Sequence, residues 1–317
     1  MKAAQITSYG DAADVLRIND VDRPAPGAGE VLVRVEASSV NGHDVIVRSG
    51  EMKIVSGRRF PLGTGLDFAG VVTGSGTGVE DLRVGDRVWG TVHPRQRHTI
   101  GGAAEYVVVP ADRLAPAPAT LSAADAASLV VAGATALIAV RDTVRLAPGE
   151  KVLVRGAAGG VGTAAVQLAH ALGCHVTALA RARHAPALTD LGADEVLDHG
   201  STTSDRVGPF DAIVDTVGTE LNCYRSRLAK GGRMVTVGLS APALAAIAAS
   251  SVYGARRVRT FSANPDATVL RALADHVTSG ALRPVVNSVY PFADIVAAHQ
   301  AFERGGVVGK HVVAVSE

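Results

Sequence analysis

The chain has 317 residues, more than one ordinary domain needs, so we expect two packed units. Hydrophobic residues make up 47% of it and charged residues 19%, a composition that excludes a disordered chain. The 31 basic and 30 acidic side chains leave a net charge of +1, too little to direct the protein onto nucleic acid or an anionic membrane. We therefore expect neither as a partner.

The cysteines and the apolar runs favour a protein of the cytoplasm. Cys174 and Cys223 are too few for a disulfide framework, and neither belongs to a paired spacing such as CxxC. The first residues lack the long apolar core of a signal peptide. The most apolar run, residues 126–140, lies between Asp125 and Arg141 and is shorter than the roughly 20 residues that a membrane-spanning helix needs. We expect a buried helix there.

The first 120 residues or so have the pattern of short strands and turns. Strands are expected at residues 31–35, 70–72, 86–89 and 106–109, with glycine- and proline-rich turns between them. Strands at this spacing predict an antiparallel unit, barrel-like or sandwich-like.

The pattern changes near Leu121. Ser122 and Asp125 form a capping-box signature at the start of a long helical run. From Lys151 onward short apolar strands alternate with helices, which predicts a parallel, doubly wound sheet and an α/β protein. The strands are expected at residues 152–154, 175–179, 195–197, 212–214 and 234–237.

The last part of the chain is expected to return to the first unit. A helix is predicted at residues 268–278, followed by the mainly apolar stretch 282–286, and a closing strand is predicted at 312–315. A strand at the very end is most easily added to a sheet that already exists. The predicted units are therefore residues 1–120 with 264–317, and residues 121–263.

The strongest signal is a glycine-rich turn that follows a buried strand and opens a helix, expected over residues 163–172. Ala157, Gly159 and Gly162 stand at the three glycine positions of the pattern GxGxxG. Backbone N–H groups and the positive end of the helix together form a site for a pyrophosphate. A turn without a ligand is the alternative, but the flanking strand and helix favour a dinucleotide site. The residues expected at the pyrophosphate are Ala157, Ala158, Gly159, Gly160, Val161 and Gly162.

The end of the second strand of this sheet indicates which nicotinamide cofactor binds. An NAD site has Asp or Glu there, bonded to the ribose 2′-hydroxyl. This chain has Arg181 and Arg183 and no acid among residues 178–183. A guanidinium pairs with the 2′-phosphate of NADPH through two hydrogen bonds. The alternative, that both are solvated charges, is less favourable because a helix N-terminus repels cations. We therefore predict NADPH.

Motifs spread along the whole chain resemble those of one enzyme family. They are Asn41–Asp44, Arg48–Gly50, Phe60–Leu62, Gly65–Val72, Val84–Val88, Gly102–Tyr106, Ala157–Gly162, Leu191–Glu195 and Gly309–Lys310. In this order they resemble a zinc-independent medium-chain dehydrogenase/reductase of the quinone oxidoreductase (zeta-crystallin-like) type. The resemblance implies a GroES-like substrate domain built from both chain ends, a Rossmann domain between them, and a cleft that joins the two. It also implies an NADPH-dependent reductase of quinones or activated double bonds, often a homodimer.

Zinc alcohol dehydrogenases are relatives of this family, so a zinc site has to be considered. The resemblance places Asn41 at their catalytic cysteine and Leu66 at their ligand histidine, and neither replaces those ligands. His93 and His98 lie in a polar stretch without partner ligands, which favours a solvated loop. We predict no metal. Without a Lewis acid to acidify an alcohol, reduction of a conjugated double bond is the favoured chemistry.

The resemblance also implies the residues around the nicotinamide. Asn41 and Thr135 are expected beside its ribose and ring as positioning groups, with local capping as the alternative role. His43 is a candidate proton donor, although a surface histidine explains it equally well, and solvent is the expected donor. The catalytic candidates are thus Asn41, Thr135 and His43. Further cofactor contacts are expected from His199, Val237, Gly238, Leu239, Phe261 and Ser262.

One departure from the family pattern concerns the substrate. Quinone-reducing relatives often carry tyrosines at the positions of Ile46 and Met52, and their loss removes stacking surface and a hydroxyl. The leading hypothesis is a reductase of a quinone or an α,β-unsaturated carbonyl compound. A second is an enoyl-thioester or polyketide-intermediate reductase, which would need a basic patch such as Arg58–Arg59 or Arg256–Arg257. A third is a non-catalytic NADPH-binding sensor or structural protein.

Overall fold

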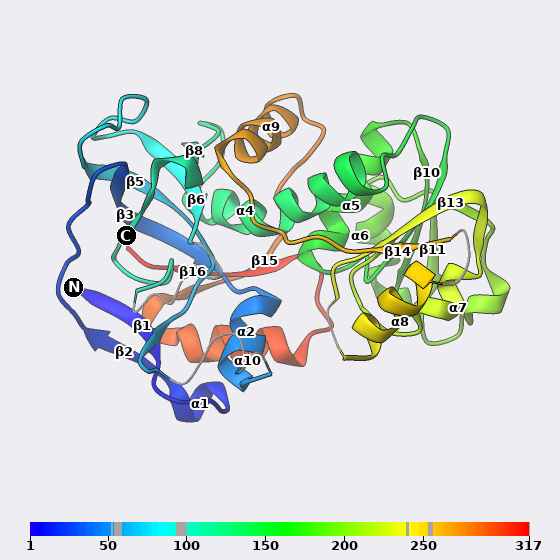
Figure 1. Ribbon diagram of the computed structural model, residues 1–317, viewed down its shortest axis with the longest axis horizontal. Helices are drawn as coiled ribbons and strands as arrows, with labels where there is room; N and C mark the ends of the chain where they lie inside the picture. The colour runs from blue at the N-terminus through cyan, green and yellow to red at the C-terminus, as the bar shows by residue number, and fades with distance from the viewer. Residues whose placement is uncertain (52, 54–58, 93–99, 239–240, 253–255, 317) are drawn as a thin grey trace.

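Two large sheets of different kinds organise the described part of the chain, and Figure 1 shows them side by side with helix α4 between them. The computed structural model describes all residues except 52, 54–58, 93–99, 239–240, 253–255 and 317. Both chain ends lie in the half drawn on the left, and the middle of the chain forms the half on the right.

Among the described residues, the first large sheet has seven strands and is mainly antiparallel. Its order is β15–β16–β3–β5–β6–β8, and β7 pairs with β3. On β3, Val31, Val33 and Val35 alternate into the interior and pack with Phe68 of β5. The four strands predicted in the first 120 residues correspond to β3, β5, β6 and β7, so the antiparallel unit is confirmed. The strands are β3 (Glu30–Ser39), β5 (Asp67–Ser75), β6 (Arg87–Thr91), β7 (Tyr106–Pro110), β8 (Leu114–Pro116), β15 (Val286–Pro291) and β16 (Lys310–Ala314).

The closing strand returns to this sheet, as predicted. β16 pairs antiparallel with β3, with Val312 opposite Ser39. Strand β15 begins at Val286, the last residue of the stretch 282–286. Pro284 precedes it and has no N–H to donate to a sheet ladder. The domain boundaries at residues 120 and 263 stay predictions.

Shorter elements complete this half of the fold. A small sheet pairs β2 (Leu16–Asp20), β1 (Lys2–Ile6) and β4 (Leu62–Gly63). The helices here include α1 (Ala12–Val15), α2 (Gly42–Ser49), α9 (Ala267–Thr278) and α10 (Ile295–Arg304). Helix α9 confirms the helix predicted at 268–278.

The second large sheet has six parallel strands in the part of the chain that the structure describes, in the order β11–β10–β9–β12–β13–β14. If these strands are numbered 1 to 6 along the chain, their order in the sheet is 3-2-1-4-5-6, which is the order of a dinucleotide-binding Rossmann sheet. The predicted parallel sheet is therefore confirmed, and its topological switch point lies between β9 and β12. The strands are β9 (Lys151–Arg155), β10 (His175–Ala180), β11 (Glu195–Asp198), β12 (Phe210–Asp215), β13 (Leu228–Thr236) and β14 (Val258–Arg259).

Helices connect these strands. They are α5 (Gly160–Ala171), α6 (Ala185–Asp190), α7 (Leu221–Arg225) and α8 (Ala241–Val252). Helix α5 begins at Gly160, three residues before the predicted start at Thr163, and Gly159 is its N-cap. Glycine is tolerated there because the first turn of a helix has free N–H groups in any case. Helix α7 ends at Arg225 rather than at Arg227, since Leu228 already begins β13.

Helix α4 (Ala123–Leu137) lies between the two halves, where it contacts β3, β5 and β16 on one side and α5 on the other. The hydroxyl of Ser122 accepts a hydrogen bond from the Asp125 N–H at 3.1 Å, which confirms the predicted cap. Within the described residues, the helical stretch Ala123–Thr143 is the one long and apolar enough to cross a membrane, and 78% of its apolar window is buried inside the protein. It is the core helix of this fold.

Candidate active site

The predicted nucleotide turn lies between β9 and α5, at the carboxyl edge of the parallel sheet. Gly156 has a φ of 69°, and a Cβ there would lie 2.3 Å from Thr216 Oγ1, so only glycine fits. A Cβ on Gly162 would lie 2.3 Å from the carbonyl oxygen of Gly156, so α5 packs closely on the turn. At Gly159, by contrast, the nearest atom would be 3.6 Å away. The outer side of the turn is therefore open, as a pyrophosphate site requires.

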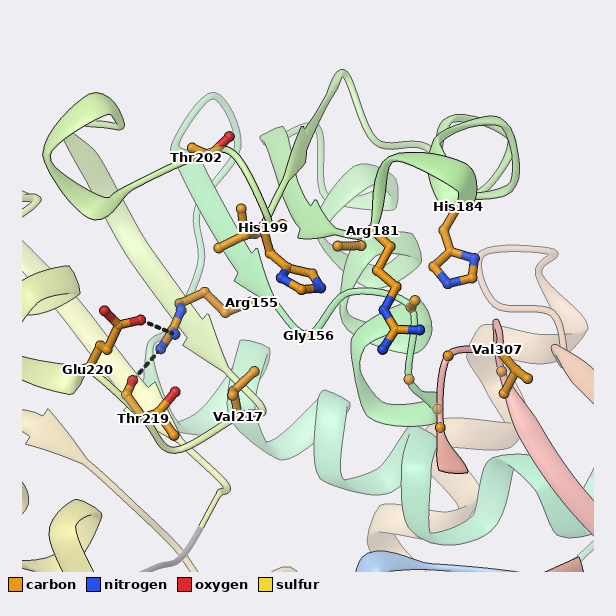
Figure 2. Close-up of a pocket in the computed structure, with 18 of the residues that line it drawn as sticks. Arg155, Gly156, Arg181, His184, His199, Thr202, Val217, Thr219, Glu220 and Val307 are labelled. Carbon is orange, nitrogen blue, oxygen red and sulfur yellow. Dashed lines mark hydrogen bonds and ion pairs between the residues drawn. The ribbon is translucent and has the colours of Figure 1, made fainter. Parts of the chain in front are cut away.

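A cavity of about 640 Å³ opens in front of this turn. The predicted cofactor residues that line it are Ala158, Gly159, Gly160, Arg181 and His199. Figure 2 shows Arg181 and His199 at the cavity, from the segments that follow β10 and β11. Sequence reasoning missed the segment before β16, which also lines the cavity and comes from the other half of the fold; its lining residues are Gly305, Gly306, Val307 and Gly309.

Arg181 and Arg183 both approach that segment at one glycine. The guanidinium of Arg183 donates a hydrogen bond to the carbonyl oxygen of Gly306 at 2.5 Å. A Cβ on Gly306 would lie 2.4 Å from Arg181 Nη1. The carboxylate of Asp198 accepts a hydrogen bond at 2.9 Å from the backbone of the loop after β10. Burial, with the charges of Arg183 and Arg181, lowers the pKa of His184, so the two arginines carry the positive charge here.

Sequence reasoning also missed a buried ion pair at the same edge. Arg155 ends β9, and its Nη1 lies 2.5 Å from Asp215 Oδ1 at the end of β12. The same Nη1 donates to the Thr219 carbonyl oxygen at 2.8 Å, and the guanidinium lies 3.7 Å from the centre of the Tyr224 ring. Arg155 lines the cavity (Figure 2). The available signal is a charged residue that ends each of two strands directly after three apolar residues.

The other half of the fold contributes Asn41, which precedes α2 and is 6% exposed. Its Nδ2 donates to the Ser39 carbonyl oxygen at 3.1 Å and to Asp67 Oδ2 at 3.0 Å. Its Oδ1 accepts a hydrogen bond from Lys310 Nζ at 2.7 Å. Both amide hydrogens are therefore used inside the protein, and the side chain also takes part in a capping box with the backbone N–H of Asp44. Asn41 therefore has no hydrogen left to donate to a ligand.

Asp44, Asp67 and Lys310 form a buried charged cluster around Asn41. The Asp44 carboxylate accepts hydrogen bonds from the N–H groups of Asn41 at 2.9 Å and Gly65 at 3.2 Å. Burial, and then the charge of Asp67, raise the pKa of Asp44 to about 7. Burial lowers the pKa of Lys310, against the opposing effect of the two carboxylates. With two carboxyl groups for one ammonium, the cluster keeps a proton on Asp44 up to about neutral pH.

The other two catalytic candidates differ in what they offer a ligand. Thr135 lies on α4 and is 4% exposed. Its hydroxyl has no hydrogen-bond partner among the described residues, so it remains available to a ligand. His43, on α2, is partly buried, and burial lowers its pKa, so the imidazole is mainly neutral at pH 7. Ile46, on the same helix, is half-buried.

The remaining predicted contacts follow β13 and β14. The Val237 N–H donates to the Asp215 carbonyl oxygen at 3.0 Å, and a Cβ on Gly238 would lie 2.6 Å from the backbone nitrogen of Gly218. Both residues thus lie against the end of β12, beside the switch point. Phe261 packs against the core around α4, and Ser262 is exposed. The cavity lining does not include Asn41, Thr135, Val237, Gly238 or Phe261. Leu239, Met52, Arg58, His93 and His98 lie outside the described residues.

Leu66 and Asp67 occupy the place where a zinc ligand pair was considered. Leu66 is apolar and 8% exposed. Asp67 accepts hydrogen bonds from the backbone N–H of Ser39 at 2.8 Å and from its hydroxyl at 2.7 Å. In the part of the chain that the structure describes, no group of three His, Cys, Asp or Glu side chains is placed to hold a metal ion. The donor set around Leu66 does not fit zinc.

Comparison with known proteins agrees with this arrangement. The family described as the alcohol dehydrogenase GroES-like domain matches residues 27–119, and the family described as zinc-binding dehydrogenase matches residues 191–313. The human mitochondrial NAD(P)H oxidoreductase RTN4IP1 is 33% identical over 331 residues, which cover 90% of this chain and 82% of that protein.

Solved structures lead to the same family. The quinone oxidoreductase from Coxiella burnetii has a TM-score of 0.90 and 30% identity, over 100% of this chain and 99% of that chain. A mycobacterial protein complexed with NADPH has a TM-score of 0.84 and 30% identity, over 99% and 100% of the two chains. The chain is an NAD(P)H oxidoreductase with GroES-like and Rossmann domains, and it belongs to the quinone oxidoreductase family of the medium-chain dehydrogenase/reductases.

Proposed function

We propose that this protein uses NADPH to reduce a quinone or an α,β-unsaturated carbonyl compound, without a metal ion. The observation that carries the proposal is the cavity, in which an open nucleotide turn lies beside Arg181, where an NAD site would have an acid. The similarity to a protein complexed with NADPH supports the choice of cofactor. NADPH would supply the hydride.

The chain's own residues would hold and orient the reactants. The free N–H groups at the start of α5 suit the pyrophosphate, and Arg181 suits the 2′-phosphate. The Thr135 hydroxyl suits the nicotinamide ribose or carboxamide, and Asn41, held by Lys310, would border the same end of the cofactor. Because the amide hydrogens of Asn41 are already used, Asn41 is not the donor that stabilises a developing enolate oxygen. That role falls to other donors of the cleft or to water.

The source of the proton and the need for a metal ion can be argued from the same residues. Reduction of a conjugated double bond leaves an enolate that has to be protonated. His43 is mainly neutral at pH 7 because burial lowers its pKa, so we propose solvent as the proton source. Leu66 and the fully engaged Asp67 offer zinc no ligand set, so nothing lowers the pKa of an alcohol hydroxyl here. This favours enone reduction over alcohol oxidation.

Two other functions remain as outcomes of a test. An enoyl-thioester reductase would need a basic patch, and Arg256 instead donates a hydrogen bond to the Ser226 carbonyl oxygen at 3.1 Å. A non-catalytic sensor would bind NADPH without turnover. Ile46 lacks the ring that stacks on a quinone, so we place enones before quinones as substrates. The homodimer and the cytoplasmic location stay predictions.

A screen of NADPH oxidation against quinones, enones and enoyl thioesters tests the proposal. We expect steady turnover with an enone or a quinone. Turnover with thioesters alone would favour the second function, and tight NADPH binding without any turnover would favour the sensor.

Variants of the nucleotide turn test whether the NADPH used in this screen binds at the predicted place. Gly159→Asp should abolish NADPH binding because it places a carboxylate against the pyrophosphate, whereas Gly159→Ala should fold normally, since its nearest neighbour lies at 3.6 Å. Ala171→Asp adds the same charge at the exposed far end of α5 and should leave binding unchanged. Retained NADPH binding by a folded Gly159→Asp protein would show that the cofactor lies elsewhere.

A further inference from the structure

Lys310 touches both halves of the cofactor site, although it is the first residue of a strand in the substrate half. It is 5% exposed. Its ammonium donates hydrogen bonds to the Val40 carbonyl oxygen at 2.6 Å and to Asn41 Oδ1 at 2.7 Å. These contacts fix the position of the segment that precedes α2.

The stem of the same side chain lies against the nucleotide turn. A Cβ on Gly160 would lie 2.4 Å from Lys310 Cδ, so the turn leaves room for the lysine only because a glycine stands there. The preceding residue adds a backbone link, since the Gly309 N–H donates to the Ala158 carbonyl oxygen at 2.8 Å. One dipeptide therefore joins the pyrophosphate turn to Asn41.

The charge of Lys310 requires a reason, because burying an ammonium costs free energy unless it is paired. Beyond the buried His311, the next residues of β16, Val312 and Val313, are apolar and buried, so the packing of the strand itself does not need a cation. The two carboxyl groups of Asp44 and Asp67 favour the ammonium electrostatically. Lys310 thereby holds Asn41 from one side while Asp67 holds it from the other, with Nδ2 3.0 Å from Oδ2.

We propose that Lys310 is a positioning residue, which fixes the spacing between the nucleotide turn and Asn41 and so aligns the nicotinamide end of the bound cofactor. The inference rests on the proposed function, in which the pyrophosphate lies at the turn and the nicotinamide lies near Asn41. A displacement of about 1 Å at a reacting centre can slow a reaction by about a hundredfold. A residue that sets this spacing is therefore expected to act on turnover rather than on cofactor affinity.

Lys310→Met tests this, because methionine keeps an apolar stem beside Gly160 and removes the ammonium. We expect kcat with the best acceptor to fall about tenfold or more, while the Kd for NADPH stays within about threefold. An unchanged kcat in the folded variant would overturn the proposal.

A double-mutant cycle with Asn41→Ala separates action through Asn41 from action elsewhere. If Lys310 acts through Asn41, then Asn41→Ala/Lys310→Met is no slower than Asn41→Ala. Independent, multiplying losses of kcat, or a Kd for NADPH that rises in step with the loss of kcat, would overturn the proposal. The control is Lys151→Met. Lys151 is exposed at the start of β9, whereas the nucleotide turn follows the other end of that strand, so kcat and the Kd for NADPH should both stay unchanged.

A binding readout keeps this test distinct from that of the proposed function. The fluorescence lifetime of bound NADPH reports how firmly the nicotinamide is held, and it requires no acceptor. We expect the lifetime to shorten towards that of free NADPH in Lys310→Met. An unchanged lifetime in folded variants would overturn the positioning role, even if no acceptor is found. A parent protein that oxidises no NADPH, with a lifetime that still shortens in Lys310→Met, would refute the proposed function alone.

Discussion

Arg155 and Asp215 form an ion pair, with 2.5 Å between Nη1 and Oδ1, that joins the carboxyl ends of β9 and β12. These are the central strands of the parallel sheet, on either side of its switch point. The two side chains are 4% and 0% exposed. Thr236 and Gly218 donate to the second carboxylate oxygen at 2.7 and 2.8 Å. The pair therefore braces the wall of the cofactor cavity with every carboxylate oxygen used.

This pair should be essential for stability. Asp215→Asn leaves the buried guanidinium without its counter-charge, and we expect it to lower the free energy of unfolding by about 3–5 kcal/mol. The matched control is Glu220→Gln, because Glu220 lies 4.0 Å from the same arginine but is 65% exposed. That contact should contribute less than about 1 kcal/mol. Urea unfolding measures both, and similar losses in the two variants would contradict the assignment.

Cofactor choice should depend on Arg181. Arg181→Ala removes a charge-assisted contact with the 2′-phosphate, so the preference for NADPH over NADH should narrow by about 1–3 kcal/mol. Fluorescence titration with both cofactors measures the change. Arg271→Ala, exposed on α9, removes the same charge away from the cavity and should leave the preference as it was. Equal affinity of the parent protein for both cofactors would show that the arginine does not read the phosphate.

Much of the fold is local in origin, which is why the sequence predicts it. The strand at residues 152–154, the glycines after it and the cap at Ser122 are set by neighbours within a few residues. The return of β16 to β3 also follows, because an isolated final strand has to pair with an existing sheet. Strand β15 begins only at Val286, after Pro284, which has no N–H to donate to a sheet ladder.

The candidate site is predicted only where its residues follow one another in the chain. The turn at 157–162 and Arg181 could be found because strand, turn and helix occur in sequence. The contribution of Gly306 could not, since it depends on how residues more than a hundred positions apart meet across the cavity. The roles of Arg155 and Lys310 depend likewise on partners from distant strands, Asp215 and Asn41.

The buried cluster should make stability depend on pH. In the unfolded chain the pKa of Asp44 is 3.8, and in the folded protein burial raises it to about 7. Between these values the folded state binds more protons than the unfolded state, so this contribution to the free energy of unfolding is fully present below about pH 4 and is lost as pH rises to about 7. The loss should be on the order of a few kcal/mol.

Two substitutions isolate this effect. Asp44→Asn should flatten the decline in the free energy of unfolding between pH 4 and 7, measured by urea unfolding at each pH. For Asp14→Asn, at an exposed position of α1, the curve of unfolding free energy against pH should run parallel to that of the parent protein. A parallel curve for Asp44→Asn as well would mean that Asp44 does not hold the proton.

Turnover should be independent of zinc, because the residues at the place of the zinc ligands have other partners. Leu66 has no ligand atom, and Asp67 already accepts hydrogen bonds from Ser39 and Asn41. Activity on an enone or a quinone should survive prolonged chelator treatment, and elemental analysis should find no stoichiometric zinc. Alcohols should be oxidised poorly, and Leu66→His should not change this, since Asn41 supplies no thiolate. Turnover that is lost with a chelator and restored by zinc would refute the metal-free mechanism.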